Sequence, residues 1–386
     1  MFKKFSSFLS RIKGNSIETL LWIVDFFPTM VGCSYFKKEI NVVFWLVNGF
    51  FSLVSIYVYL VGSIAYYYYY AKEVIDFANI FFYISIFLVT MNIFYWMVSK
   101  RSEVEEALDF VKKNDDLVRE TGRFIKEQRS FARNMKRIVF ICYLIHLIND
   151  IFLYVLDKLI KMDDITVSSC IGLNPLSGYP NLQICMAVIF VQVLLGVILV
   201  LGYDVLFIFF TVHTTTMYQC LYKDVVNLEK ISEDPSVLEH KITILLWNLI
   251  KRHTVILDTV QKLQSIYSFV LIVDFGNTAV ALCLFFALPF DVSINFGPYI
   301  FYGLIIFFLY CFLGEKLTFA SELYEKALYC CDWENFSLKN KRMILVMMML
   351  SQKPVALKAA GIIPLRIYSF ANIMRTIYKF VTAFKM

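Results

Sequence analysis

Charged residues are scarce in this chain of 386 residues, because Asp, Glu, Lys and Arg together make up only 18% of it. A soluble domain carries about 25% charged and roughly 45–50% apolar residues. Here 59% of the residues are hydrophobic and 17% are aromatic, which excludes water as the main solvent. A linker rich in Pro, Gly or Ser is also lacking, with only 8 Pro and 14 Gly in the chain. We therefore expect one integral membrane domain.

Motifs that carry catalysis or bind metals are lacking as well. The four histidines have neither HExxH spacing nor a carboxylate arrangement that suits a metal or a triad, and no glycine-rich phosphate loop occurs. The net charge of +6 comes without a basic stripe, so no nucleic acid partner is expected. Of the 9 cysteines, only Cys170 and Cys185 are placed for a disulfide, and the sequence leaves that pairing open. These absences predict no enzyme, no metal and no cofactor.

Apolar runs of the kind that cross a bilayer recur along the chain. A hydrocarbon core of about 30 Å needs roughly 20 apolar residues in a helix. The runs that meet this length are Val42–Ala65, Phe77–Val98, Ile138–Leu156, Ile184–His213, Ser265–Leu288, Tyr299–Leu317 and Val355–Phe384. The seventh contains Lys358, Arg366 and Arg375, which are unfavourable against lipid. It is therefore expected to be shielded by its neighbours.

The first and last parts of the chain flank these runs. The apolar stretch 20–27 is short, contains Asp25 and leads into Pro28, so no cleaved signal peptide is expected. Before the seventh run, Met343–Leu350 is a separate apolar stretch that ends close to Pro354. Because proline breaks a helix, we expect a cytosolic half-helix, a break and then the membrane helix.

Orientation follows from the distribution of Lys and Arg, which accumulate in cytosolic loops. The segments 1–41, 99–137, 217–264 and 316–354 hold 29 of these residues, whereas the opposite loops and the tail hold 5. The N-terminus is therefore expected in the cytosol. An odd number of spans then places the C-terminus outside, opposite to a G-protein-coupled receptor.

Two long cytosolic segments have helical periodicity. Apolar residues recur at helical spacing among charges over Ser102–Arg137 and again over Ser232–Leu263. Both segments are expected to form helices that extend the membrane helices. Since their apolar faces need partners, we expect them to pack into an anchor domain rather than to serve as solvated connectors.

Ordered motifs in the second half of the chain resemble a known family. They are Gly202-Tyr203-Asp204-Val205-Leu206-Phe207 with His213 and Gln219, Ile250-Lys251-Arg252-His253, Tyr310-Cys311-Phe312-Leu313-Gly314-Glu315, Ala327-Leu328-Tyr329, Asp332-Trp333, Ser351-Gln352-Lys353-Pro354, Ala359-Ala360-Gly361 and Phe370. With the seven spans and the inverted topology, this set resembles the insect odorant receptors. The chain lacks the enlarged loop after the fourth span that marks the obligate co-receptor. It therefore resembles a tuning subunit.

The resemblance implies an architecture and partners. The fold would be an all-α membrane protein with seven transmembrane helices, divided into a cytosolic segment (1–41), a six-span bundle with the odorant pocket (42–317), an anchor region (318–354) and a pore-lining seventh helix (355–386). The partners would be the co-receptor, in a heteromeric tetramer, a small volatile ligand and the lipid bilayer. The location would be the plasma membrane of sensory dendrites in olfactory neurons.

A small volatile ligand needs an apolar, aromatic cavity with one or two polar groups that orient it. The outer halves of the spans contain such residues, and we assign ligand binding to Phe81, Phe82, Ser85, His146, Asn149, Asp150, Tyr154, Val188, Val191, Gln192, Tyr299, Tyr302 and Ile306. Aromatic side chains near membrane interfaces are commonly belt anchors instead. His146, Asn149 and Asp150 are more informative, because polar groups within a span are unfavourable unless they face protein or a wet cavity.

The last helix and the segment before it complete the expected sites. An apolar surface able to gate by dewetting is expected from Ile377, Phe380, Val381 and Ala383, with Lys385 near the outer mouth. Subunit contacts are expected from Trp333, Pro354 and Gly361.

Other functions remain open from the sequence alone. A gustatory-type homomeric channel is weakened because Ile377 precedes Tyr378 and Phe384 stands where those receptors have Gln. A receptor coupled to G proteins is opposed by the distribution of positive charge. A secondary transporter would show an internal repeat with matching broken helices, whereas only one break is visible.

Overall fold

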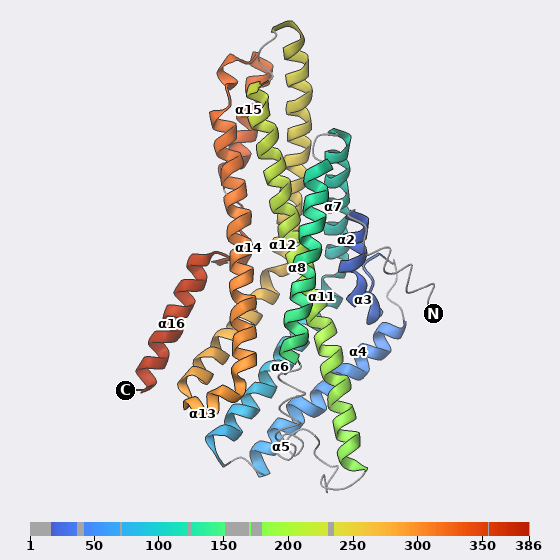
Figure 1. Ribbon diagram of the computed structural model, residues 1–386, viewed down its shortest axis with the longest axis vertical. Coiled ribbons are helices and arrows are strands. Elements are labelled where there is room, and N and C mark those ends of the chain that lie inside the picture. Colours follow the sequence, from blue (N-terminus) through green and yellow to red (C-terminus); the bar gives the residue numbers. More distant parts are fainter. Residues whose placement is uncertain are drawn as a thin grey trace.

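The computed structural model describes residues 17–36, 42–69, 72–121, 125–150, 170, 180–230, 235–353 and 355–385. It is an elongated bundle of helices (Figure 1). The shorter elements are α2 (Ile17–Val24), α3 (Phe26–Met30), α13 (Phe290–Ser293), the 3₁₀-helices η3 (Ile294–Phe296) and η4 (Trp333–Asn335), and strands β1 (Lys358–Ala359) and β2 (Ile363–Pro364). The longer helices are α4 (Val42–Ser55) with the π-helical turn η1 (Ile56–Val61) and α5 (Gly62–Tyr69), α6 (Val74–Ser99), α7 (Arg101–Thr121), α8 (Ile125–Asp150), α11 (Asn181–Lys230), α12 (Pro235–Ala287), α14 (Gly297–Cys330), α15 (Leu338–Ser351) and α16 (Ile367–Lys385).

Among the described residues, 5 helices are long and apolar enough to cross a membrane. They are Phe44–Tyr69, Val74–Ser99, Gln183–Leu228, Glu239–Ala287 and Gly297–Cys330. Each contains, apart from one or two residues at an end, one of the apolar runs predicted from the sequence. The predicted third span corresponds to the end of α8 and continues into residues that the structure does not describe, and the predicted seventh span corresponds to α16.

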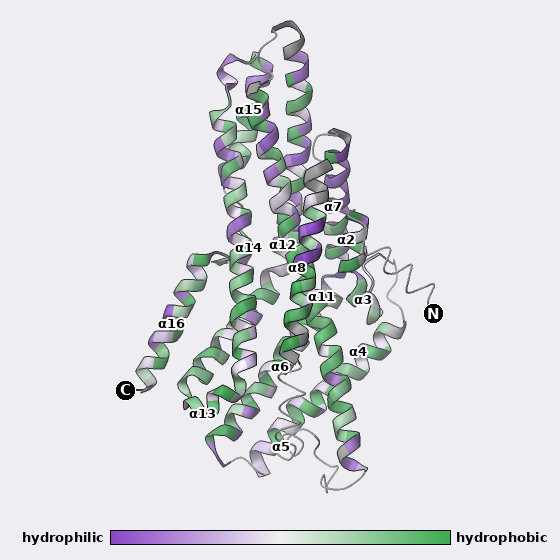
Figure 2. Ribbon diagram, in the orientation of Figure 1, coloured by the Kyte–Doolittle hydropathy of each residue, from purple (hydrophilic) through white to green (hydrophobic). Residues whose placement is uncertain are grey.

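Helices α11 and α12 are much longer than a bilayer is thick. They have 50 and 53 residues, which at a rise of about 1.5 Å per residue makes each roughly 75–80 Å long. The hydrocarbon core needs only about 30 Å of this length. Figure 2 shows the consequence, because one half of the bundle is mainly hydrophobic while the other half mixes polar and apolar residues. The predicted helix over Ser232–Leu263 is confirmed from Pro235 onward as the polar end of α12.

The segment Ser102–Arg137 is helical, but not as one helix. It divides between α7 and the beginning of α8, with residues 122–124 between them outside the described part. The apolar face of α7 is buried as expected, including Val104, Leu108 and Val111. Helix α7 packs on α12, so its apolar face meets the polar half of the same chain.

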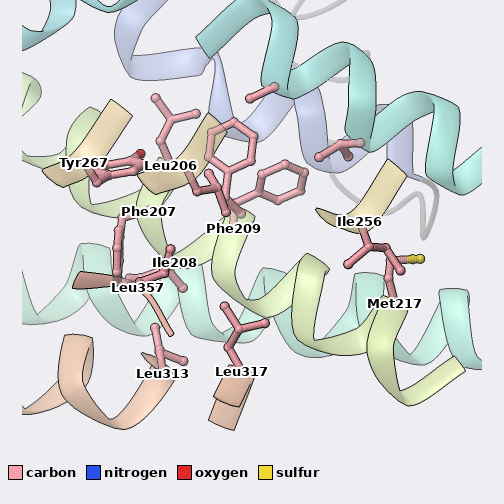
Figure 3. Close-up of a cluster of buried hydrophobic side chains, with 14 of the residues drawn as sticks. Leu206, Phe207, Ile208, Phe209, Met217, Ile256, Tyr267, Leu313, Leu317 and Leu357 are labelled. Atoms are coloured by element: carbon pink, nitrogen blue, oxygen red, sulfur yellow. The ribbon is translucent and has the colours of Figure 1, made fainter. Parts of the chain in front are cut away.

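The core is centred on α11, whose residues 201–211 are all buried. A helix that is apolar on every side belongs inside a bundle. Leu206, Phe207, Ile208 and Phe209 point in different directions from the helix, and Leu313 of α14 lies on the side of Ile208 (Figure 3). This central helix therefore connects the membrane half to the polar half without a break.

The seventh helix begins later than predicted. The sequence suggested a helix from Val355, whereas residues 358–364 form an antiparallel hairpin and α16 begins only at Ile367. Ala360 and Gly361 adopt positive φ angles of 51° and 70°, which a helix cannot contain. The Leu365 N–H donates to the Leu357 carbonyl at 2.8 Å, which closes the hairpin. The half-helix predicted over Met343–Leu350 is confirmed within α15.

Cys170 and Cys185 form a disulfide, which decides a pairing that the sequence left open. Both side chains are buried, and Ile189 packs beside them. The bridge fixes the position of Cys170 against the beginning of α11.

Candidate ligand-binding site

A cavity of about 170 Å³ lies within the apolar half of the bundle. Its walls come from η1, α6, α11, α12 and α14, so it joins segments as distant as Tyr59 and Tyr310. On the same scale, one water molecule needs about 10–15 Å³. The cavity therefore has room for a small organic molecule.

Most of the lining side chains are aliphatic or aromatic. The rings of Phe275 and Phe307 lie 4.7 Å apart between centroids, and the Tyr310 ring lies 6.1 Å from Phe275. Apolar walls with a few polar groups are typical of pockets that bind small ligands. Several of its polar groups belong to three hydrogen-bonded clusters and one separate amide.

The first cluster is centred on Asp204 of α11, which is buried. Tyr302 Oη donates to Asp204 Oδ2 at 2.9 Å, and Tyr310 Oη donates to Asp204 Oδ1. Since the two tyrosines lie two helical turns apart on α14, the carboxylate joins α11 to α14 along one face. The carboxylate is solvated by hydroxyl groups in a region without bulk water.

The second cluster lies near Tyr299 at the beginning of α14. Tyr299 Oη and Ser85 Oγ are 2.7 Å apart, and Asn277 Nδ2 donates to the same Ser85 Oγ at 2.7 Å. Phe82 packs edge-on against the Tyr299 ring, with the centroids 5.1 Å apart. The cluster therefore fixes α6, α12 and α14 relative to one another.

The third cluster joins α6 to α12. Asn92 Nδ2 donates to Asp274 Oδ1 at 2.9 Å and is 3.1 Å from the Val270 carbonyl. Asp274 itself lines the cavity. A second carboxylate therefore stands in the same cavity as Asp204.

The separate amide belongs to Gln192 of α11, which is 1% exposed. Its Nε2 donates to Ser55 Oγ, while its Oε1 is buried without a hydrogen-bond partner among the described residues. A buried carbonyl oxygen without a donor is unfavourable by about 1–3 kcal/mol. Gln192 belongs to the cavity lining, but this oxygen itself is buried among the packed side chains.

Comparison with known proteins identifies the family. The model of the seven-transmembrane family described as "7tm Odorant receptor" matches residues 70–378, which is most of the chain. The chain belongs to the odorant receptor family. The predicted all-α membrane fold with seven transmembrane helices is therefore confirmed, and five of its spans are recognisable by length and composition among the described residues.

Two curated relatives from Drosophila melanogaster agree with this assignment. Odorant receptor 82a is 26% identical over 216 residues, which cover 53% of this chain and 54% of that receptor. Odorant receptor 67a is 27% identical over 146 residues, which cover 36% of this chain and 35% of that receptor. The chain thus aligns with about half the length of the first relative and about a third of the second.

Solved structures show the same fold. The insect olfactory receptor OR5 from Machilis hrabei in complex with eugenol superposes with a TM-score of 0.77 at 13% identity, covering 95% of this chain and 98% of that one. A second structure of the same receptor gives a TM-score of 0.77 at 14% identity, covering 94% and 97%. This likeness concerns the fold.

The cavity of this odorant receptor includes several residues chosen from the sequence. Gln192, Tyr299, Tyr302 and Ile306 line it directly. Three more chosen residues contact lining residues without lining the cavity themselves. They are Ser85, which hydrogen-bonds Tyr299, Phe82, which packs on that ring, and Phe81, which packs on Phe285.

Other chosen residues lie elsewhere. Val188 and Val191 are outside the lining, and Val191 is exposed on the surface of α11. The side chains of His146, Asn149 and Asp150, and the whole of Tyr154, lie outside the described part of the structure. Their assignment to the site stays a prediction.

Sequence reasoning missed the contribution of the fifth span. Asp274, Phe275, Thr278 and Phe285 of α12 line the cavity, although no ligand-binding residue was chosen from this helix. Asp274 carried a usable signal, because a carboxylate in an apolar run is unfavourable unless it faces the protein interior. Asp204 carried the same signal within the family motif.

A metal site receives no support from the described residues, among which no three His, Cys, Asp or Glu side chains come close enough to hold an ion. His213 is buried and packs edge-on against Phe131. It lies in the core rather than at the cavity.

Proposed function

We propose that this odorant receptor is the odorant-binding tuning subunit of a heteromeric, ligand-gated, nonselective cation channel. The second subunit is the odorant receptor co-receptor, and the stimulus is a small volatile molecule. The N-terminus is cytosolic, and the channel acts in the plasma membrane of sensory dendrites. The observation that carries the proposal is a direct contact between the cavity wall and α16.

Phe307 makes this contact. It lines the cavity on one side, while its ring lies 5.1 Å between centroids from Phe370 at the beginning of α16. The neighbouring Phe308 ring lies 5.5 Å from the same Phe370 ring. Because packed aromatic rings transmit displacement rather than absorb it, a ligand that shifts Phe307 also shifts α16.

Helix α16 has the surface expected of a helix shared between subunits. Ile377 is 3% exposed and faces its own chain, whereas Tyr378 is 70% exposed. In Figure 1, α16 diverges from the rest of the bundle towards the C-terminus. We therefore assign the pore surface to Phe380, Val381 and Ala383, which lie at the same end of the helix, and we retain Lys385, whose side chain is outside the described part.

The anchor proposal rests on α15. Leu345, Val346 and Met349 are exposed on this helix, and the exposed fraction of Met349 is 64%. An apolar face that water would otherwise cover is typical of a subunit contact. Trp333 is half-buried against its own core, and we propose that its remaining surface joins this contact with Gly361 and with Pro354, which is not described.

The main experiment expresses the chain with and without the co-receptor in cells without other odorant receptors. We expect odour-evoked cation current only from the pair, with a panel that includes eugenol. Robust current from the chain alone would contradict the heteromeric proposal and favour a homomeric channel. An epitope on the C-terminus that antibodies do not reach in intact cells would contradict the orientation.

A second experiment tests the contact between cavity and pore helix. Phe307→Ala should reduce maximal current while ligand still binds, because the ring that joins the cavity to Phe370 is gone. Phe301→Ala is the matched control, since Phe301 is exposed on the same helix. Equal currents from both variants at equal surface expression would refute this coupling.

A third experiment concerns assembly. Trp333→Ala should reduce co-purification with the co-receptor without changing the ranking of odorants, because buried aromatic side chains often dominate association. Undiminished co-purification would instead assign Trp333 to the core of its own subunit.

A further inference from the structure

Thr278 lies at the centre of the part of the cavity wall that α12 contributes. Phe275, three residues before it, and Ala281 and Leu282, three and four residues after it, line the same cavity. Residues at these spacings share one face of a helix. Val280, on the opposite side of α12, is 51% exposed. The Thr278 side chain therefore faces the cavity rather than the lipid.

The Thr278 hydroxyl lacks the bond that a threonine hydroxyl in a helix commonly makes to a carbonyl oxygen of the preceding turn. In the described parts of α6, α11, α12, α14 and α16, every other threonine makes this bond, to the carbonyl four residues before it, at 2.7–3.0 Å. Thr278 Oγ1 has no hydrogen-bond partner among the described residues. Its own helix therefore leaves this hydroxyl available.

The two branches of the Thr278 side chain have different surroundings. The methyl group lies on the side of α14, where a Cβ atom at Gly303 would be only 3.2 Å from it. The oxygen of this half-buried residue is not fully enclosed by protein atoms. The methyl group therefore packs against the neighbouring helix, while the hydroxyl is accessible from the cavity.

Other donors of the cavity wall are already engaged or enclosed. The tyrosine hydroxyls of the first cluster donate to Asp204. Thr90, which also lines the cavity, donates to the Ile86 carbonyl at 2.8 Å. The hydroxyl of Tyr203 is fully buried. The Thr278 hydroxyl is therefore an accessible donor that these bonds leave for a ligand.

We propose that Thr278 selects neutral ligands with an acceptor oxygen, such as ketones, over hydrocarbons of the same shape. Its hydroxyl donates to the ligand oxygen, and the hydrocarbon part of the ligand packs against the apolar wall around Phe275 and Phe307. A hydrocarbon that fills the cavity expels water and leaves the hydroxyl unpaired, which is unfavourable. The inference deepens the proposed function and rests on it only in taking the cavity as the ligand site.

Binding to the full-length chain in nanodiscs tests the inference without channel activity. The probes are acetophenone, 1-phenylethanol and cumene, which share a benzene ring with a substituent of similar size. Their dissociation constants follow from the rise in Tm with probe concentration. Because each probe is compared between the wild type and a variant, differences in hydrophobicity between the probes cancel.

Thr278→Val is the decisive variant, because valine has a methyl group where threonine has the hydroxyl. It should weaken the binding of acetophenone and 1-phenylethanol by about two- to twelve-fold, as expected for the loss of one neutral hydrogen bond. Cumene should bind at least as tightly as before, since no hydroxyl is left unpaired. Thr278→Ser keeps the hydroxyl and should keep the wild-type ratio between the ketone and hydrocarbon affinities.

Thr90→Val is the matched variant in the same wall. Since the Thr90 hydroxyl already bonds to its own helix, this substitution should change the affinities of the three probes by the same factor.

Three results would overturn the inference. They are equal effects of Thr278→Val on all three probes, weakened binding of the alcohol alone, and a Thr278→Ser variant that discriminates among the probes as Thr278→Val does. If Thr278→Val does not fold, the comparison of Thr278→Ala with Thr278→Ser decides the matter by the same criteria.

Current recordings with the co-receptor keep this inference separate from the proposed function. Selective weakening of the ketone by Thr278→Val, without any odour-evoked current from the wild type, would refute the channel proposal and leave the role of Thr278 standing. Odour-evoked current, with equal effects of Thr278→Val on all three probes, would do the reverse.

Discussion

Replacement of Gly314 by Ala should displace the hairpin that precedes α16 and destabilise its packing on α14. An added Cβ atom would lie 2.7 Å from Leu365 Cβ and closer still to the Leu365 backbone oxygen. Carbon atoms pack at about 3.5–4.0 Å, so the hairpin must retreat by roughly 1 Å. Because the clash involves backbone, no change of side-chain rotamer relieves it. The expected loss is about 1–3 kcal/mol of unfolding free energy.

Gly276→Ala is the matched control for this prediction. Gly276 also lies in a long apolar helix, but a Cβ atom there has nothing within 4 Å. Each substitution gains about 1 kcal/mol of helix propensity, and this gain cancels when the two variants are compared. The difference between them therefore measures the clash alone.

Thermal unfolding of the two purified variants is the assay, followed by current recording. Gly314→Ala should unfold several degrees below Gly276→Ala and should lose current more than ligand binding, because the hairpin positions the beginning of α16. Equal unfolding temperatures would show that the hairpin moves without loss of stability. The close approach of Leu365 to α14 would then have no structural importance.

Three further predictions concern other parts of the chain. Arg252→Met removes the guanidinium that pairs with the buried Asp224 carboxylate and should lower the unfolding free energy by about 3–5 kcal/mol. The double variant Arg252→Met/Asp224→Leu should regain most of this stability. Denaturant titration of the two variants measures both changes. Burial raises the pKa of Asp115 from 3.8 to about 6, so the protonated carboxyl stabilises the fold fully below pH 3.8, and this contribution is lost as the pH rises through about 6. Between pH 3.8 and about 6, the Tm of Asp115→Asn should fall less than the Tm of the wild type. Cys170→Ser opens a disulfide between residues 15 apart and should lower stability by about 3 kcal/mol, with reductant shifting the Tm of the wild type only.

The apolar runs predicted most of the membrane helices because a helix in the hydrocarbon core must be apolar along its whole length. The fifth run, Ser265–Leu288, ends within one residue of α12 at Ala287. The periodicity of Ser232–Leu263 predicted the polar end of the same helix. The sequence did not show that the two parts form one helix of 53 residues, because no local signal marks the continuity.

The hairpin before α16 was only partly predictable from local pattern. Residues 355–366 are apolar enough to extend the seventh helix, but Gly361 and Pro364 within them are local signals against a continuous helix. The turn is stabilised by distant partners, since the Ala360 N–H donates to the Ser268 carbonyl of α12 at 2.8 Å and Gly314 leaves room for Leu365. Positive φ at Ala360 is favourable only with those contacts in place.

The sequence by itself determined the class of the protein, the membrane helices and the family, because composition, apolar length and ordered motifs are properties of the chain read in order. It also indicated the polar residues that must avoid lipid. Only the tertiary structure decided which of them share a cavity. Asp204, Asp274 and Gln192 line one cavity because α11 and α12 pack against each other and against α6 and α14. This arrangement depends on helix packing over long sequence separations, and no local stretch of sequence contains it.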